Sequence, residues 1–525
     1  MSDLTPARLW TDRLEHWADV QPDAHCVTYQ DQTYTWGEWR DRVHRVAGGL
    51  KALGVGRGDR VASIDMNNLS TVEVTNAAAL LGAAHAIVNF RIFGEQLGYV
   101  LADSAPKVVV VGADFVANLE AVRDQAPSIE HVIVVGGSSG DDRDEYQQWV
   151  ANSEPAQQDP AVEPDDTVIV MYSSGTTGFP KGVELTHRNM NVHSENNNSH
   201  FNFGPGVKSL AAMPLFHVGG TSYVQIGMHW GASTHMLREV EPMAMFQAIG
   251  AGADRLFLVP AVVAGVLAGG EGAIKAFSGL KSFCYGASPM PLPLLRKALD
   301  TWPDLEFSQV YGMTEFGGVI TSLSPAAHRD ESHPERLTSA GQPIDGAEMR
   351  IVDPHTGEDV APGETGEMWF RTEQTMKGYL GKPEATAETI TEDGWLRTGD
   401  LGRTDEEGFV YVLDRIKDMI VSGGENIYSP EVESVISAHP QVAEVAVFGV
   451  PHPQWVEAVH AVVAPKPGET IDPDEVIAFT RERLAHYKCP KSVEVIDVLP
   501  RNPSGKILKR DLRAPHWEGR DSVIA

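Results

Sequence analysis

The sequence predicts a multidomain α/β fold, in which a large N-terminal domain of helix-covered, mostly parallel sheets precedes a small α+β domain. Three observations support this prediction. The chain has 525 residues, which exceeds what one hydrophobic core usually supports. Apolar runs of strand length alternate with stretches of helical periodicity through about the first four hundred residues. The pattern changes to short strands with glycine turns around residues 363–411 and starts again after residue 414.

The strands expected in the large domain are short continuous apolar runs, which are typical of parallel sheets buried on both faces. They cover residues 60–64, 84–89, 107–111, 131–135, 167–171 and 255–259. The expected helices cover residues 36–53, 71–81, 95–101 and 189–200. Because strands and helices alternate along the chain, the helices are expected to cover the faces of the sheets.

The later part of the chain predicts two smaller pieces. Alternating strands near residues 366–371 and 408–412 indicate an antiparallel or barrel-like subdomain at about 330–414. A compact α+β module of about a hundred residues follows, and residues 414–424 are the candidate junction. The first helix of this module is expected at 429–439, with Ser429 as its cap and Pro430 at its first position. The further elements expected are strands at 444–450, 459–464 and 492–498 and a helix at 472–484.

The composition indicates a soluble globular protein, with 42% hydrophobic and 22% charged residues. The net charge of −30 argues against a nucleic-acid partner. Cys26, Cys284 and Cys489 lie far apart, which fits a reducing cytoplasm and argues against disulfides and a cysteine metal site. No signal peptide is recognisable, and the longest apolar stretch, 256–269, is too short for a membrane span. We therefore expect a soluble, cytoplasmic protein, with a surface-bound form as the alternative.

Residues 172–183 have the composition of a polyphosphate-binding loop. The segment contains three glycines, which let the backbone approach an anion, and four hydroxyl donors that precede Lys181. It follows an expected strand, so the loop should leave the end of a sheet. Pro180 stands where a Walker motif needs glycine. A flexible surface loop is equally compatible with this composition alone.

Five further stretches accompany this loop in a fixed order along the chain. They are Tyr-Gly-Ala-Ser-Pro at 285–289, Tyr-Gly-Met-Thr-Glu at 311–315, Trp-Leu-Arg-Thr-Gly-Asp at 395–400, Asp-Arg-Ile-Lys-Asp at 414–418, and Pro-Ser-Gly-Lys-Ile at 503–507. Together with the loop they resemble the adenylate-forming enzymes, which include acyl- and aryl-CoA synthetases, luciferases and the adenylation domains of peptide synthetases. The resemblance covers essentially the whole chain and is strongest to the fatty-acyl- and aryl-CoA ligases.

The resemblance implies a nucleotide site built from several of these stretches. The residues that it assigns to ATP or AMP are Ser173, Ser174, Gly175, Thr176, Thr177, Lys181, Gly286, Ala287, Ser288, Gln309, Val310, Tyr311, Gly312, Thr314, Asp400, Arg415, Lys417 and Lys506. The loop and Lys181 would cradle the β- and γ-phosphates, and Tyr311 would stack on adenine. Asp400 and Arg415 would bind the ribose.

The catalytic residues implied by the resemblance are Lys506, Thr314, Glu315 and His217. Lys506 would contact the substrate carboxylate and the α-phosphate, and Thr314 would hydrogen-bond the α-phosphate. Glu315 would hold Mg²⁺, because a carboxylate is a hard oxygen ligand. These residue types suit the chemistry, since a carboxylate becomes a good acyl donor only after attack on the α-phosphorus of ATP. That step gathers negative charge, which positioned cations and donors stabilise.

Simpler interpretations exist for several of these residues. Tyr311 could be a core aromatic residue, Asp400 a turn residue, and Lys506 a solvated lysine. The basic residues near Lys506 could form only a solvated face; they are Lys488, Lys491, Arg501, Lys509 and Arg510. Because the chain is so acidic overall, we interpret this concentration of basic residues as a binding site for phosphates.

The resemblance also implies a domain rotation between two half-reactions. An N-terminal adenylation domain at 1–414 would bind ATP and the acid, residues 415–417 would form a hinge at Lys417, and a mobile domain at 418–525 would carry Lys506. Gly423 and Gly424 would line the coenzyme A channel, where backbone without side chains fits a narrow tunnel; an ordinary loop is the alternative. The family's Trp-Gly-Glu is Trp-Val-Glu at 455–457 here, so the chain departs from the family pattern in a segment expected near coenzyme A.

The stretch 213–221 matches the border of the acyl pocket in the coenzyme A ligases. The pocket residues implied are His217, Val218, Gly219, Gly220, Val259, Tyr285, Met313 and Phe316, and the two glycines would leave room for the acyl chain. A histidine satisfied by the backbone is the alternative for His217. No Asp or Glu lies between Ala211 and Val224, so the region lacks the partner that an amino-acid ammonium group would need.

The sequence therefore predicts an ATP- and Mg²⁺-dependent ligase that joins a medium- or long-chain fatty acid to coenzyme A. The alternatives are a ligase for aryl acids such as cinnamates or benzoates, an acyl-AMP ligase that loads a carrier protein, and a nucleotide-sensing scaffold without turnover. The expected partners are small molecules only, and a homodimer is left open.

Overall fold

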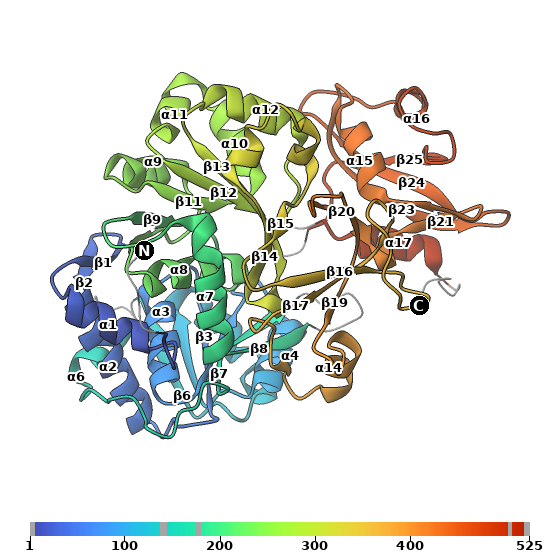
Figure 1. Ribbon diagram of the computed structural model, residues 1–525. Helices are drawn as coiled ribbons and strands as arrows, with labels where there is room; N and C mark the ends of the chain where they lie inside the picture. The colour runs from blue at the N-terminus through green and yellow to red at the C-terminus, as the bar shows by residue number, and fades with distance from the viewer. Residues whose placement is uncertain (1–5, 137–143, 174–179, 502–506, 519–525) are drawn as a thin grey trace. The chain divides into compact units, whose positions relative to one another are not determined.

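The computed structural model describes residues 6–136, 144–173, 180–501 and 507–518, and Figure 1 shows the arrangement of its elements. The chain divides into two compact units. The first is Met1–Glu348 with Arg371–Leu396, and the second is Met349–Phe370 with Arg397–Ala525. The expected domains, with boundaries at 414 and 418 and a hinge at 415–417, stay a prediction.

A seven-stranded sheet in the first unit has a parallel centre and an antiparallel edge. Its order is β18 (Gly378–Tyr379), β8 (Lys181–Thr186), β7 (Thr167–Ser173), β4 (Ala84–Val88), β3 (Arg60–Ile64), β5 (Val108–Gly112) and β6 (His131–Val135). The strands from β7 to β6 are parallel, whereas β8 is antiparallel to both β7 and β18. The expected strands of this sheet are confirmed to within two residues at each end.

A nine-stranded sheet lies in the same unit (Figure 1). Its order is β15 (Gln342–Pro343), β14 (Gly318–Leu323), β13 (Glu306–Met313), β12 (Ser282–Gly286), β11 (Arg255–Leu258), β9 (Lys208–Ala211), β10 (Ser233–Met236), β1 (His25–Tyr29) and β2 (Gln32–Thr35). The strands from β13 to β1 are parallel, and β2, β14 and β15 pair antiparallel at the two edges.

Helices connect and cover these strands. They are α1 (Asp12–Val20), α2 (Trp36–Ala52), α3 (Leu69–Leu80), α4 (Gly94–Ser104), α5 (Val116–Glu120), α6 (Glu145–Asn152), α7 (His187–Phe201), α8 (Val218–His229), α9 (Pro242–Gly250), α10 (Pro260–Ala268), α11 (Gly270–Phe277), α12 (Leu292–Thr301), α13 (Pro325–His328) and α14 (Pro383–Thr389). The four expected helices are confirmed with end shifts of a few residues. At α2, Thr35 and Glu38 form a capping box, which satisfies the first N–H groups of the helix.

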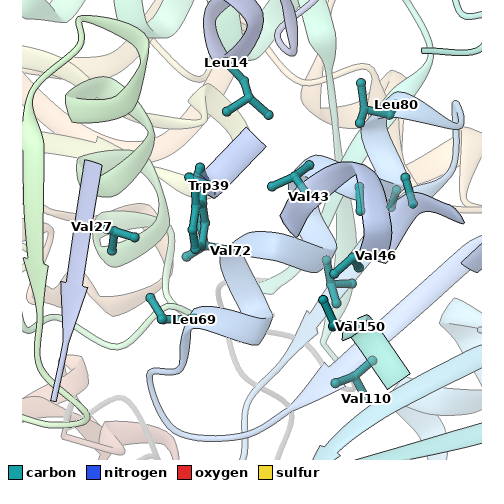
Figure 2. Packing of buried hydrophobic residues seen from close by; sticks show 14 of the residues in the cluster. Leu14, Val27, Trp39, Val43, Val46, Leu69, Val72, Leu80, Val110 and Val150 are labelled. Carbon is teal, nitrogen blue, oxygen red and sulfur yellow. The ribbon is translucent and has the colours of Figure 1, made fainter. Parts of the chain in front are cut away.

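The main core packs α1, α2, α3 and α6 against residues from both sheets, as Figure 2 shows for part of the cluster. Val27 of β1 and Val110 of β5 belong to it. Val109 and Val111 of β5 instead join a second core under α4. Because alternate residues of a strand face opposite sides, a strand with a core on each side needs apolar residues at every position. This explains why the strands were recognisable as continuous apolar runs.

Among the residues that the structure describes, the second unit contains two sheets and three α-helices. The four-stranded sheet has the order β16 (Glu348–Val352), β17 (Gly366–Arg371), β19 (Leu396–Thr404) and β20 (Val410–Arg415). The other sheet has the order β22 (Glu425–Ile427), β21 (Ile420–Ser422), β24 (Val456–Pro465) and β23 (Val442–His452), with β25 (Ser492–Val495) parallel to β24. The helices are α15 (Ser429–Ser437), α16 (Pro473–Arg481) and α17 (Lys509–Trp517).

The prediction that Ser429 caps the helix after the junction is wrong. Ser429 is the first residue of α15, and the cap position is Tyr428, whose side chain forms no capping hydrogen bond. The carboxylate of Asp414 takes this role, because its Oδ2 accepts from the Ser429 backbone N–H at 2.7 Å and from the hydroxyl at 2.9 Å. A carboxylate at a helix N-terminus satisfies a donor and complements the helix dipole.

The helices that the structure describes include none with the length and apolarity that a membrane crossing requires.

Candidate functional site

The two strands that flank the hydroxyl-rich loop are antiparallel neighbours. β7 ends at Ser173 and β8 begins at Lys181, and these two residues are partners in the strand register. Both are half-buried. The remaining loop residues expected to bind phosphate lie outside the described residues; they are Ser174, Gly175, Thr176 and Thr177.

Lys181 is part of a small cluster that also contains Tyr379 and Glu315. The ammonium nitrogen of Lys181 lies 4.7 Å from the ring centroid of Tyr379. The Tyr379 hydroxyl donates to Glu315 Oε1 at 2.9 Å. Burial, and then the neighbouring Glu315, raise the pKa of Tyr379, which keeps its hydroxyl protonated as a donor. The cluster thus combines the cation of Lys181 on β8 with the carboxylate of Glu315 in a turn, and Tyr379 on β18 orients that carboxylate.

Pairing of short strands produces this cluster. β18 lies antiparallel to β8, with Tyr379 opposite Val183, so the tyrosine is brought beside the strand that carries Lys181. Glu315 belongs to the 3₁₀ turn η3 (Thr314–Phe316), and its carbonyl accepts from the Met376 N–H at 2.8 Å. Tyr379 is a site residue that the sequence did not reveal, since no motif links it to Glu315 across 64 positions.

The residues expected to bind adenine lie at the carboxyl ends of two parallel neighbours. β12 and β13 pair with Gly286 opposite Val310. Beyond β12, Ala287 and Ser288 are exposed, and at the end of β13, Gly312 is exposed and Tyr311 half-buried, as are Gln309 and Thr314. Tyr311 is therefore not a core aromatic residue. Ligands of open α/β sheets bind outside the carboxyl ends of parallel strands, where these groups are located.

Close backbone approach requires glycine at two of these positions. A Cβ at Gly286 would lie 2.5 Å from the carbonyl oxygen of Val310, and one at Gly312 would lie 1.8 Å from that of Gly318. Ala287 has a φ of 64°, a left-handed conformation that costs an alanine about 1–2 kcal/mol. Such strain is typical of functional loops that the surrounding structure holds in place.

His217 is positioned by the start of α8. It occupies the cap position, and its Nδ1 accepts from the Gly219 N–H at 3.3 Å. Because Nδ1 is the acceptor, the neutral ring carries its proton on Nε2. The side chain is half-buried. The hydrogen bond to the backbone therefore orients the ring, and part of the ring stays exposed to solvent.

The other residues expected in the acyl pocket differ in exposure. Val259 and Met313 are half-buried, whereas Val218, Tyr285 and Phe316 are buried. The Tyr285 hydroxyl is 2.8 Å from His328 Nε2. Their role toward an acid stays a prediction.

The two glycines at the start of α8 are explained by packing rather than by open space. A Cβ at Gly220 would lie 2.2 Å from the carbonyl oxygen of Pro214, and one at Gly219 would lie 3.0 Å from the ring of Phe257. The positions vacated by their missing side chains are therefore filled by the protein. The room that we expected these glycines to leave for an acyl chain is not located there.

The second unit holds the residues expected to bind ribose. Asp400 and Arg415 are register partners on β19 and β20 and form an ion pair at 3.3 Å. The aspartate is buried and the arginine is half-exposed. The two side chains thus lie next to each other on neighbouring strands, and their binding of ribose stays a prediction.

The residue expected to be the hinge, Lys417, is in the 3₁₀ turn η5 (Ile416–Asp418). Burial lowers the pKa of its ammonium group, and its carbonyl oxygen accepts from Arg513 of α17 at 3.3 Å. The last helix is therefore bonded to the backbone of this turn.

Gly423 and Gly424 form the tight connection of a hairpin. They join β21 to β22, with Ser422 opposite Glu425, and have φ values of 62° and 88°. Two residues of positive φ are what a two-residue hairpin turn of this kind needs. The turn alone explains these glycines, and their contact with coenzyme A stays a prediction.

The basic residues near the C-terminus are already paired within the second unit. Lys488 bonds Glu431 at 2.7 Å, and Lys509 bonds both Glu433 and Ser429 at 2.7 Å. The other three have partners as well: Arg501 pairs with Glu444, Arg510 with Asp511, and Lys491 with the carbonyl of His486. Local ion pairs account for four of these cations and a backbone hydrogen bond for Lys491, which weakens their interpretation as a binding site for phosphates. Lys506 itself lies outside the described residues.

Comparison with known proteins identifies two family models in the sequence. A model described as AMP-binding enzyme matches residues 14–380, and one described as AMP-binding enzyme C-terminal domain matches residues 431–506. Similar curated proteins include a fatty acid–[acyl-carrier-protein] ligase, ScoC, of Streptomyces coeruleorubidus, which is 34% identical over 95% of each chain. A feruloyl-CoA synthase of an Amycolatopsis species is 38% identical over 94% of this chain and 96% of its own.

Solved structures are similar over nearly the whole chain. The o-succinylbenzoate CoA synthetase of Bacillus subtilis, in complex with an acyl-adenylate, has a TM-score of 0.84 and 30% identity over 97% of this chain and 99% of its own. ATP-bound MatB from Rhodopseudomonas palustris has a TM-score of 0.86 and 29% identity over 96% and 98% of the two chains.

Proposed function

Because this chain belongs to the family of AMP-binding enzymes and is an AMP-forming acid–thiol ligase, we propose that it activates a medium- or long-chain fatty acid for transfer to coenzyme A. Its cosubstrates are ATP and coenzyme A, and its metal is Mg²⁺. The observation that carries the proposed site is the gathering of half-buried and exposed polar groups where β12 and β13 end, beside the turn that holds Thr314 and Glu315.

In the proposed first step, the acid's carboxylate attacks the α-phosphorus of ATP, forms a carbon–oxygen–phosphorus bridge, and pyrophosphate leaves. Lys181 would attract the departing phosphates, and the Thr314 hydroxyl would donate to the α-phosphate. Tyr311 would stack on adenine, while the ion pair of Asp400 and Arg415 would open to bind the ribose hydroxyls. In the second step the coenzyme A thiol attacks the acyl carbon and AMP leaves. Both steps depend mainly on positioning and charge stabilisation.

The residues present fit the proposed Mg²⁺ site. Glu315 is buried, with 6% exposure, and its carboxylate is oriented by the Tyr379 hydroxyl. A carboxylate oxygen fixed in this way is a ligand type that Mg²⁺ prefers. The ion would neutralise phosphate charge, and Tyr379 would hold the carboxylate in one orientation.

A fatty acid is favoured by the residues around the start of α8. Residues 211–224 contain no acidic side chain, so an amino-acid substrate would leave its ammonium group unpaired, which is costly in a buried site. The neighbouring Phe216 and Val218 are buried in an apolar cluster with Met190. The similarity to a ligase named for fatty acids supports the same substrate class.

An aryl acid is the second candidate, and an aromatic cluster favours it. Tyr223 of α8 lies 5.6 Å from Phe201, 5.3 Å from Phe203 and 5.9 Å from Phe257, measured between ring centroids. Such edge and tilted arrangements pack well against another aromatic ring. The similarity to a feruloyl-CoA synthase points to the same class.

A panel of acids at equal concentration, read by pyrophosphate release, tests the substrate class. We expect kcat/KM to rise with chain length among straight-chain acids and to exceed that for ferulate, coumarate and benzoate. A higher kcat/KM for the aryl acids would overturn the fatty-acid proposal and leave the ligase chemistry intact. Replacing coenzyme A by a phosphopantetheinyl carrier protein in the same assay tests the carrier-loading alternative, which requires faster AMP release with the carrier.

Lys506 is proposed to act only in the first step. We expect Lys506→Ala to lose acyl-adenylate formation far more than thioester formation from a supplied acyl-adenylate. Lys509→Ala is the matched control, because that lysine is held by Glu433 and Ser429. Equal damage to both half-reactions in Lys506→Ala would refute the role.

The three cysteines are free and buried. This supports the proposal that the protein acts in the reducing cytoplasm. The homodimer stays a prediction.

A further inference from the structure

His460, Glu494 and His516 gather on one face of the sheet in the second unit, and none of them is assigned to ATP, the acid or coenzyme A. One ligand atom from each lies within 4.8 Å of the other two. His460 is on β24, Glu494 on β25 and His516 on α17. Two imidazoles and a carboxylate are the donor set of many sites for zinc and similar divalent metals.

The strand register places two of these residues side by side. His460 of β24 is opposite Ser492 of the parallel strand β25, and Glu494 follows two positions later on the same face. This face also carries Phe448 and Val462, against which Leu512 of α17 packs. The helix is therefore held over the face from which His460 projects, and its His516 ring lies 4.8 Å from the His460 ring.

Hydrogen bonding leaves one nitrogen of His460 available to a ligand. His460 is 5% exposed, and its Nδ1 lies 2.7 Å from the Ser492 hydroxyl oxygen. When Nδ1–H donates to that oxygen, the neutral ring presents an unshared pair on Nε2. This Nε2 is buried and has no hydrogen-bond partner among the described residues, and Glu494 Oε2 is 3.7 Å from it. A hydrogen bond from the other ring N–H fixes the tautomer and the orientation of a histidine that binds a metal.

The surrounding charges agree with a neutral His460. Burial, and then the neighbouring His516, lower the pKa of His460, whereas Glu494 raises it. A metal ion binds imidazole in its neutral form. Glu494 supplies the negative charge that such a cation needs.

We propose that His460, Glu494 and His516 form a site for a zinc-like divalent metal that ties α17 to β24 and β25. Ligand atoms about 2.0–2.2 Å from a tetrahedral zinc are about 3.4 Å apart, so the cluster needs shifts of about 1 Å. Glu494 and His516 are exposed and free to make them. Water or a fourth ligand completes the coordination.

This site shares no residue with the proposed Mg²⁺ site, and a metal bound there would stabilise the position of α17. α17 donates from Arg513 to the carbonyl of Lys417 and to Glu457 at 2.9 Å. It also donates from Trp517 to the carbonyl of Gly449 at 3.1 Å. Lys509, at the start of the helix, also bonds Glu433 and Ser429. A metal near the end of this helix adds a further tie, so zinc should slow the opening of α17.

Calorimetric titration of the full chain with Zn²⁺, in excess Mg²⁺ and without nucleotide, tests the proposal. We expect one Zn²⁺ per chain, with at least tenfold weaker binding in His516→Ala and in Glu494→Gln. Ser492→Ala should weaken binding by about 10–100-fold through loss of the supporting hydrogen bond. His486→Ala and Glu475→Gln, which change exposed residues of the same unit, should bind Zn²⁺ like the unchanged protein.

Hydrogen exchange tests whether the bound metal holds α17 in place. Zn²⁺ should slow exchange of the α17 amides in the unchanged protein and in His486→Ala, and should leave it unchanged in His516→Ala. The proposal is overturned if micromolar Zn²⁺ does not bind, or if His516→Ala and His486→Ala bind it equally well.

Discussion

Val456 has a φ of 72°, which places a β-branched residue in the left-handed region that favours glycine. It begins β24 and faces Ser422 and His452 in the strand register. The resemblance to the adenylate-forming enzymes leads one to expect glycine at this position, between Trp455 and Glu457. Position 456 therefore keeps a backbone conformation that suits glycine, although valine is strained in it.

The strain can be measured by comparing two substitutions. Val456→Ala and Val456→Gly remove nearly the same packing, but only glycine relieves the left-handed strain, which is about 1–2 kcal/mol. Glycine in turn loses about 0.5–1 kcal/mol to alanine through its freedom in the unfolded chain. We therefore expect Val456→Gly to be more stable than Val456→Ala by about 0.5–1 kcal/mol.

Val495 is the matched control. It is a strand valine of the same unit, with 38% exposure against 45% for Val456, and its φ is not positive. There the order should reverse, with alanine more stable than glycine by about 0.5–1 kcal/mol. Equilibrium urea unfolding followed by circular dichroism measures both differences. If alanine is the more stable residue at both positions, the strain argument at Val456 fails.

Three other substitutions test separate parts of the account. Tyr379→Phe keeps the ring beside Lys181 but removes a hydrogen bond to a charged group, worth about 1.5–3 kcal/mol. It should lower kcat/KM for ATP at least tenfold, whereas Tyr146→Phe, which loses a similar bond of 2.7 Å to Glu73, should lower stability only; equal kinetics in the two variants would refute the role of Tyr379. Burial raises the pKa of Asp65 from 3.8 to about 6, so its ionisation destabilises the fold as pH rises through this window. The stability advantage of Asp65→Asn over the unchanged protein should therefore grow by about 2 kcal/mol from pH 4 to pH 7 in urea titrations, and a constant difference would contradict this. Lys417→Pro should spare adenylate formation and slow thioester formation in separate half-reaction assays, and loss of the first step in a folded variant would count against the hinge.

The sequence predicted the central strands well because burial on both faces leaves a clear signal. β3 and β6 have the bounds that the apolar runs indicated. β9 and β10 were not predicted, since Lys-Ser-Leu-Ala and Ser-Thr-His-Met are short and half polar. Their parallel neighbours in the sheet, rather than their own pattern, hold them as strands.

The site shows the same division between local and long-range information. Motifs predicted Asp400 and Arg415, which lie on neighbouring strands and form an ion pair. Tyr379 was missed because its link to Glu315 arises from strand pairing between distant segments. The cap of α15 was misassigned for the same reason, since Asp414 is 15 positions from the residue that it bonds.

Exchange of labelled pyrophosphate into ATP tests the central claim most directly, because it reports acid activation without coenzyme A. The full chain with Mg²⁺ should catalyse exchange that depends on an added carboxylic acid, and Lys506→Ala should abolish it. Nucleotide binding without acid-dependent exchange, across both fatty and aryl acids, would contradict the account.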